Sequence, residues 1–234
     1  MKEKTSSKRP FYKQIWFWII IVVAFTGLLG AVFMAGKNSN ESTSHTKTDQ
    51  KSYDSSTESS NLVTDDYGDQ TSKDNITLQK IYYKINVGDL MKDGKGGSTY
   101  TYVKKSLQSG PSETSSNEIS GVETKVAKWE YDDMTLNFTF VNNRVVKSSI
   151  TDFRWERPEN RITLKAYKKL SDKTSPDSVT KKFGLPDEVE QSQTLGIYKT
   201  IYSWYTGIQG SEGSSLDLEF TGTLLTNKSE TGLS

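Results

Sequence analysis

The sequence predicts an α+β protein in which a single transmembrane helix precedes a tandem repeat of helix–helix–antiparallel sheet modules. Three observations support this fold class. Residues 15–35 form an apolar run without a charge. From residue 76 onward, aromatic and β-branched residues recur with regular spacing. The order of expected helices and strands over 76–157 then returns over 158–234, and a period of about 80 residues is too long for a solenoid unit and favours a duplicated module.

The apolar run IWFWIIIVVAFTGLLGAVFMA is long enough to cross a bilayer as a helix. Residues 1–14 carry five basic side chains against one acidic one. This bias predicts a cytoplasmic basic tail, with the rest of the chain outside the cell membrane. A cleaved signal peptide is disfavoured, because the run is longer than a usual signal core and cleavage after Ala35 would place Phe33 where a small residue is preferred. A buried helix of a soluble core is the third interpretation. We expect an uncleaved, single-pass signal anchor.

Residues 36–75 are dominated by Ser, Thr, Asn, Asp and Lys. Such a segment buries too little apolar surface to offset the entropy lost on ordering. It is therefore expected to be a disordered extracellular linker, which separates the membrane from a domain formed by residues 76–234.

The composition excludes several kinds of function. A formal net charge of +1 does not indicate a nucleic-acid-binding protein. The chain has no cysteine, so disulfides, thiolate metal sites and cysteine nucleophiles are excluded. His45, the single histidine, lies in the polar segment, which disfavours catalytic triads and zinc sites built on histidine. We therefore expect no metal and no cofactor.

The first module begins with two short helices. Residues 76–85 carry apolar side chains at helical spacing. Residues 98–107 form the second expected helix, with a strand as the alternative because this segment is rich in Thr and Tyr. Alternating patterns at 123–131, 135–141 and 144–155 predict an antiparallel meander. Asn142 and Asn143 suit a tight turn between the last two strands, since asparagine tolerates positive φ.

The second module repeats this order. Residues 161–170 are the first expected helix. In SPDSVTKKFGLPDE, Ser175 suits a helix cap, Pro176 the first helical position and Gly184 the end of the helix. Strands are expected within 198–207, 215–222 and 223–231, and each module has room for one more short strand after its second helix.

Two segments, WEYDDMTLNFTFVNNRVV (129–146) and FGLPDEVEQSQTLG (183–196), resemble known proteins. They are similar to the tandem module of the β-lactamase-inhibitor-protein-like superfamily. More closely, they resemble a membrane-anchored family of unknown function from Gram-positive bacteria. The resemblance covers roughly residues 76–233. It implies that the sheets of the two modules join into one curved sheet, and that the protein binds a partner through the concave face and hairpin loops.

The candidate binding residues are aromatic or acidic. A one-layer sheet backed by helices leaves one face free, and exposed aromatic residues are frequent at binding surfaces. The alternative is that these aromatics build the core. The resemblance implies that Asp132 and Asp133 correspond, by their position in the first module, to a loop that the β-lactamase inhibitor protein inserts into its enzyme. The alternative is that this acidic pair forms an ordinary solvated turn. The candidates are Trp129, Tyr131, Asp132, Asp133, Tyr202, Trp204 and Tyr205.

The sequence thus predicts a non-enzymatic, membrane-tethered interaction domain outside the cell, whose partner is an unidentified protein or envelope component and not a nucleic acid. The alternative is an inhibitor of a β-lactamase or a penicillin-binding-type enzyme. A hydrolase of wall polymer is disfavoured, because nothing in the sequence indicates two carboxylates that face each other about 5–10 Å apart.

Overall fold

The computed structural model describes residues 62–119, 121–131, 134–153 and 155–234. These residues belong to one compact unit, Ser60–Ser234. The predicted transmembrane helix and most of the predicted linker lie outside the described residues. Among the helices that are described, none is long and apolar enough to cross a membrane.

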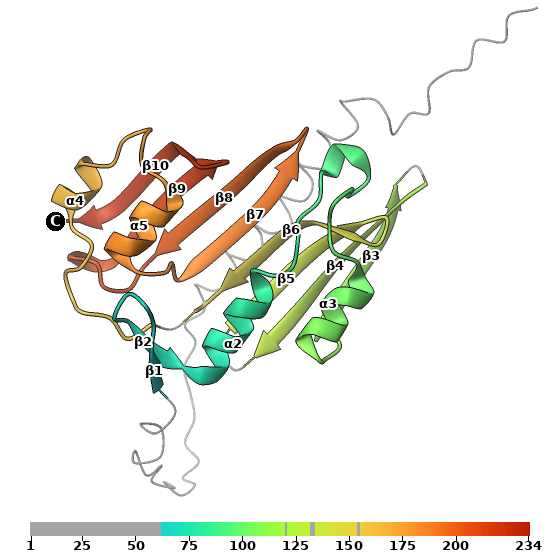
Figure 1. The fold of residues 1–234 in the computed structure, drawn as a ribbon, viewed down its shortest axis with the longest axis horizontal. Helices are drawn as coiled ribbons and strands as arrows, with labels where there is room; N and C mark the ends of the chain where they lie inside the picture. The colour runs from blue at the N-terminus through green and yellow to red at the C-terminus, as the bar shows by residue number, and fades with distance from the viewer. Residues whose placement is uncertain (1–61, 120, 132–133, 154) are drawn as a thin grey trace, which may run out of the picture. The chain divides into compact units, whose positions relative to one another are not determined.

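An eight-stranded antiparallel sheet forms the body of the domain (Figure 1). Each strand pairs with its neighbour in sequence, in the order β10-β9-β8-β7-β6-β5-β4-β3. Four residue pairs, from Lys147–Ser192 to Ile150–Val189, join β6 to β7 and thereby connect the two halves into one sheet. The strands are β3 (Glu113–Ile119), β4 (Val122–Tyr131), β5 (Met134–Val141), β6 (Arg144–Thr151), β7 (Glu188–Thr194), β8 (Ile197–Trp204), β9 (Gly210–Thr221) and β10 (Leu224–Leu233).

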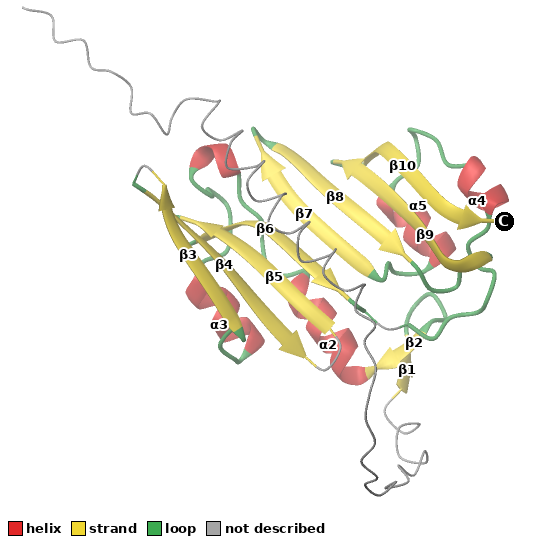
Figure 2. Ribbon diagram, turned by 180° about the vertical axis from the view of Figure 1, so that it is seen from behind, coloured by secondary structure: helices red, strands yellow, loops and turns green. Residues whose placement is uncertain are grey.

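The helices all lie on one side of this sheet, which faces the viewer in Figure 1 and points away in Figure 2. The first half contributes α2 (Lys73–Tyr82), the short helix η3 (Leu90–Lys92) and α3 (Tyr100–Leu107). The second half contributes α4 (Leu164–Lys168) and α5 (Pro176–Phe183). Each half therefore has two α-helices followed by four strands, including the additional short strand left open above. Whether this order arose by duplication stays a prediction.

Local signals explain where the helices begin and end. Ser175 caps α5 in a reciprocal capping box, Pro176 opens the helix, and Gly184 ends it with a φ of 83°. The segment 98–107, for which a strand was the alternative, is helical because Thr99 caps it and Val103 and Leu107 are buried on one face. The Asn142–Asn143 turn has the expected positive φ angles.

Two hydrophobic clusters fill the space between helices and sheet, one in each half. In the first, Tyr100 of α3 meets Phe140 of β5 edge-on at 5.2 Å between ring centroids. In the second, Phe183 of α5 meets Trp204 of β8 edge-on at 6.0 Å. Tyr202 packs against both clusters, so the two cores are continuous across the junction of the halves.

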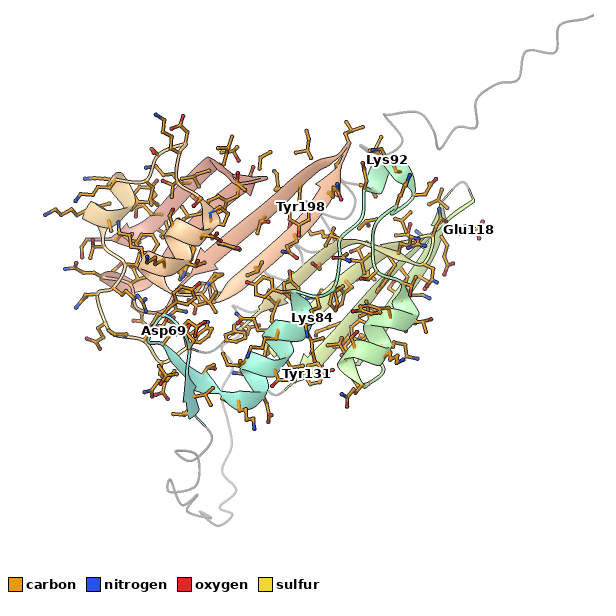
Figure 3. All side chains as sticks on the ribbon, viewed as in Figure 1. Asp69, Lys84, Lys92, Glu118, Tyr131 and Tyr198 are labelled. Atoms are coloured by element: carbon orange, nitrogen blue, oxygen red, sulfur yellow. The ribbon has the colours of Figure 1, made fainter. Side chains whose placement is uncertain are left out.

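The domain begins earlier than residue 76. Leu62–Thr64 and Gln70–Ser72 form a hairpin, β1–β2, and α2 starts at Lys73. The predicted linker boundary at residue 75 is therefore wrong. The predicted boundary rested on apolar burial alone, because the sequence does not reveal long-range polar contacts. In the structure, Gln70 exchanges two backbone hydrogen bonds with Glu156, and the buried carboxylate of Asp69 holds the hairpin to the second half (Figure 3).

Candidate interaction face

The sheet has one face toward the helices and one face away from them, which we call the open face. Alternation along the strands assigns residues to each face. Trp129, Phe138 and Trp204 belong to the core, so their sequence neighbours point to the open side. No helix within the described residues covers that side (Figure 2). The register places charged and polar residues on it, together with the apolar residues Val126, Val141, Ile197, Ile201 and Leu224. The charged and polar ones include Lys128, Glu130, Asn137, Lys147, Ser149, Glu188, Glu190, Lys199, Ser203, Asp217 and Glu219.

Charges of opposite sign alternate across the open face. The Nζ atom of Lys147 lies 2.9 Å from Oε1 of Glu190, and these residues are diagonal neighbours on β6 and β7. Lys199 and Glu219 make the same kind of contact between β8 and β9, also at 2.9 Å. The open face therefore carries ion pairs whose charged groups a partner could bind in place of their present neighbours. Such a surface suits a partner with a complementary pattern of charges.

One end of the open face is acidic. Glu188, Ser203 and Asp217 are lateral neighbours on β7, β8 and β9. The hydroxyl of Ser203 donates to Oδ1 of Asp217 at 2.6 Å, and the hydroxyl of Tyr205 donates to Oε2 of Glu188 at 3.0 Å. Burial, helped by three nearby carboxylates and opposed by Tyr205, raises the pKa of Glu188 to about 7. The charge at this end consequently changes near neutral pH.

Trp129 and Trp204 are core residues. Their exposed fractions are 1% and 0%, and each indole N–H donates to a backbone carbonyl, of Ser109 at 3.2 Å and of Gly184 at 3.3 Å. A buried indole needs such an acceptor. The interpretation of these two aromatics as core, stated above as the alternative, is thus the one the structure shows, because the helices cover their side of the sheet.

The other candidate residues are divided between the two sides. Tyr131 is half-buried on the helical side, where its hydroxyl contacts Ser109 at 2.7 Å and donates to the carbonyl of Leu107 at 3.1 Å. Tyr202 is half-buried against Trp204. Tyr205 is 43% exposed and bonds Glu188 of the open face. Asp132 and Asp133 lie outside the described residues, so their role stays a prediction.

The lysines and glutamates of the open face were not predicted as candidates, because the aromatics of the same strands are the stronger sequence signal. The signal was present, since Lys128 alternates with Trp129, and Lys199 and Ser203 alternate with Tyr202. A strand that alternates large aromatic and charged residues predicts one buried and one solvated face.

Asp89 shows a second contact between the halves that the sequence did not indicate. Its carboxylate is 3% exposed and accepts hydrogen bonds from the amides of Leu195 at 3.0 Å and Gly196 at 2.7 Å, in the turn between β7 and β8. Because the partners are more than a hundred residues apart, no local pattern reveals this pairing.

In the described part of the chain, no group of three or more His, Cys, Asp or Glu side chains could hold a metal ion. A shallow depression lies on the helical side instead, between α3 and the residues that follow it, and is lined by Tyr100, Thr101, Lys104, Lys105, Gln108, Ser109 and Gly110.

Comparison with known proteins identifies the class. Residues 74–233 match a family described as a domain of unknown function with solved structure (DUF3862), and the chain belongs to this family. The fold is similar to the crystal structure, at 1.40 Å resolution, of a "putative beta-lactamase inhibitor protein" from Streptococcus mutans. The TM-score is 0.58 at 24% sequence identity, over 68% of this chain and 98% of that one. A search of curated proteins gave no match. The domain therefore has a β-lactamase-inhibitor-protein-like α+β fold.

Proposed function

We propose that this protein is a non-enzymatic interaction domain that binds a protein or another envelope component through the open face of its sheet. One observation carries the proposal. All described helices lie on one side, which leaves the other face of the eight strands uncovered by them, and there charged and polar side chains are mixed with apolar ones such as Ile197, Ile201 and Leu224. A broad sheet face with paired charges at its centre and Tyr205 at its end combines the polar and aromatic groups typical of recognition surfaces.

The domain is tethered to the outer side of the cell membrane in this proposal. The apolar run 15–35 and the basic residues before it support a single-pass anchor with a cytoplasmic N-terminus. Protease added to intact cells should then degrade residues 62–234 and spare a short N-terminal fragment. Complete protection of the domain in intact cells, with digestion after lysis, would contradict the orientation.

Charge reversal on the open face tests the binding proposal. The 62–234 fragment is immobilised and exposed to solubilised envelope proteins and to isolated wall polymer. Replacing Lys147→Glu together with Lys199→Glu should abolish capture of whichever component the native fragment retains, because both substitutions place like charges beside Glu190 and Glu219.

The matched control changes the same charge on the other side of the sheet, with Lys165→Glu and Lys181→Glu, both exposed on helices. This variant should capture the component as well as the native fragment does. Equal capture by all three fragments, or loss with the control alone, would rule out the open face as the binding surface.

Inhibition of a β-lactamase or a penicillin-binding-type enzyme is the second candidate. It is supported by the fold shared with the S. mutans protein. Titrating the fragment against purified enzymes of both types decides between a general interaction role and inhibition. Unchanged turnover at micromolar fragment would dismiss the inhibitor, while leaving the interaction proposal to the capture experiment.

A further inference from the structure

The helical side of the domain carries an excess of exposed lysines. Only three exposed carboxylates, Asp74, Asp172 and Asp177, lie on the same segments, residues 73–84, 100–110 and 163–184. We call the exposed lysines of these three segments the helical lysines. One of them, Lys84, is labelled beside α2 in Figure 3. The set comprises Lys73, Lys80, Lys84, Lys104, Lys105, Lys165, Lys168, Lys169, Lys173, Lys181 and Lys182.

The helical lysines differ from the sheet lysines in their partners. Lys128, Lys147 and Lys199 each make an ion pair with a glutamate on the sheet. Within the described residues, no helical lysine has a carboxylate oxygen within 4.0 Å. Their charges are thus not neutralised inside the domain, and the helical side presents a positive surface.

Helix electrostatics explain only part of this excess. A helix dipole favours lysine in the last turn, which accounts for Lys80 of α2, Lys104 and Lys105 of α3, Lys165 and Lys168 of α4, and Lys181 and Lys182 of α5. Lys73 occupies the first position of α2, where the dipole opposes a positive charge. Lys73, Lys84, Lys169 and Lys173 are left without this explanation, and an external anion would offset their charge.

Two exposed tyrosines lie among the helical lysines. Tyr83, at the end of α2, is 41% exposed, and Tyr102 on α3 is 46% exposed. Tyrosine and lysine together are typical of protein surfaces that contact lipid headgroups, where the ring reaches the interface and the ammonium group reaches phosphate.

We propose that the helical lysines bind the anionic phosphate headgroups of the bilayer, so that the helical side rests on the membrane surface and the open face points away from it. This inference rests on the proposed membrane anchor. Residues 36–61 separate the apolar run from Leu62, and even fully extended they span only about 90 Å. A tethered domain meets the bilayer surface at high local concentration, which makes individually weak lysine contacts effective.

The experiment uses the full chain in lipid nanodiscs. The chain has no cysteine, so one cysteine introduced by Thr101→Cys on α3, or by Ser229→Cys on the open side of β10, carries a single fluorophore. Quenching by a headgroup-labelled lipid reports how close each site lies to the bilayer. Discs of phosphatidylglycerol are compared with discs of phosphatidylcholine.

The Thr101→Cys label should be quenched in anionic discs and little in zwitterionic ones, whereas the Ser229→Cys label should be unaffected by lipid charge. Raising the salt from about 0.1 M to about 0.5 M should remove the difference. Replacing Lys104, Lys105, Lys181 and Lys182 by Gln should weaken the quenching about tenfold or more. The control replaces Lys128, Lys147 and Lys199 by Gln, all of them paired with glutamate on the open face, and should keep the quenching.

Equal quenching of both labels, or quenching that ignores lipid charge, would overturn the inference. Binding of soluble polyphosphate by the chain without any quenching in anionic discs would point to a free polyanion as the ligand and overturn the membrane contact. Failure of the chain to incorporate into discs would instead contradict the anchor. The labelled 62–234 fragment, which lacks the apolar run and the basic tail, then tests the helical lysines alone on preformed anionic vesicles, and absence of binding there would refute them.

Discussion

The Nη2 atom of Arg157 lies 2.7 Å from Oδ1 of Asp187, and neither side chain is exposed to solvent. The same guanidinium faces Asp69 of the β1–β2 hairpin, with 3.8 Å between Nη1 and Oδ2, and Arg161 donates to the other oxygen of Asp69. This buried cluster joins the N-terminal hairpin to the start of β7. Burial lowers the pKa of Arg157 and raises that of Asp69, and in each case the opposite charges nearby work against the shift.

Removing Arg157 should destabilise the domain strongly. Arg157→Met leaves Asp187 and Asp69 buried without their shared cation, and breaking a buried ion pair from one side costs about 3–5 kcal/mol. Urea unfolding of the 62–234 fragment measures the loss. Lys165→Met, at an exposed helical position, is the control and should change the free energy of unfolding by about 0.5 kcal/mol or less. A loss below about 1 kcal/mol for Arg157→Met would show that the cluster is not needed for stability.

Gly184 should tolerate no side chain. Its φ is 83°, and an added Cβ would overlap the carboxylate of Asp69. Gly184→Ala therefore combines backbone strain with displacement of the buried cluster, and a loss above about 2 kcal/mol is expected. Gly213 has a φ of 80° and open space around it, so Gly213→Ala isolates the backbone strain at about 1 kcal/mol. Equal losses for both variants would mean that the contact with Asp69 is unimportant.

Glu188 should make stability depend on pH. Its pKa in the folded domain is about 7, above the ordinary value of 4.5. Between these values the unfolded chain ionises while the folded one stays protonated, so stability from this group is present below pH 4.5 and is lost as the pH rises to 7. Urea midpoints from pH 4 to pH 8 for the native fragment and for Glu188→Gln should diverge over this range, with the variant more stable at the top. Parallel curves would contradict the shifted pKa.

Asp89 should hold the β7–β8 turn against the first half. In Asp89→Ala the amides of Leu195 and Gly196 lose their acceptor, and leaving such groups unpaired costs about 1–3 kcal/mol. Hydrogen exchange measured by NMR should then be faster at these two amides than in the native fragment. Asp172→Ala, an exposed carboxylate beyond α4, should leave both rates unchanged. Unchanged protection in Asp89→Ala would show that other contacts hold the turn.

Local signals predicted much of the fold. The cap of α5, the glycine at its end and the Asn142–Asn143 turn depend on neighbouring residues, and the structure has all of them. The hairpin before α2 was missed because its order depends on Asp69 meeting Arg161, which is far away in sequence. Long-range ionic contacts leave no periodic trace in a chain.

The candidate site was harder to predict than the fold. Alternation placed Trp204 and Tyr205 on opposite faces, but it could not say which face the helices cover. That depends on tertiary packing of α5 against Trp204. Trp129 and Trp204 are therefore core residues. The charged residues that alternate with the aromatics form the candidate surface instead.

Site-specific photo-crosslinking in cells tests most directly whether the open face binds a partner. A photoreactive amino acid replaces Ser149 at the centre of the open face, or Thr101 on α3, in the full chain. Binding through the open face predicts a discrete protein or polymer adduct from position 149, lost on Lys147→Glu with Lys199→Glu, and none from position 101 other than lipid. An adduct to a protein from position 101 alone, or none from position 149 in cells where the component is captured, would contradict it.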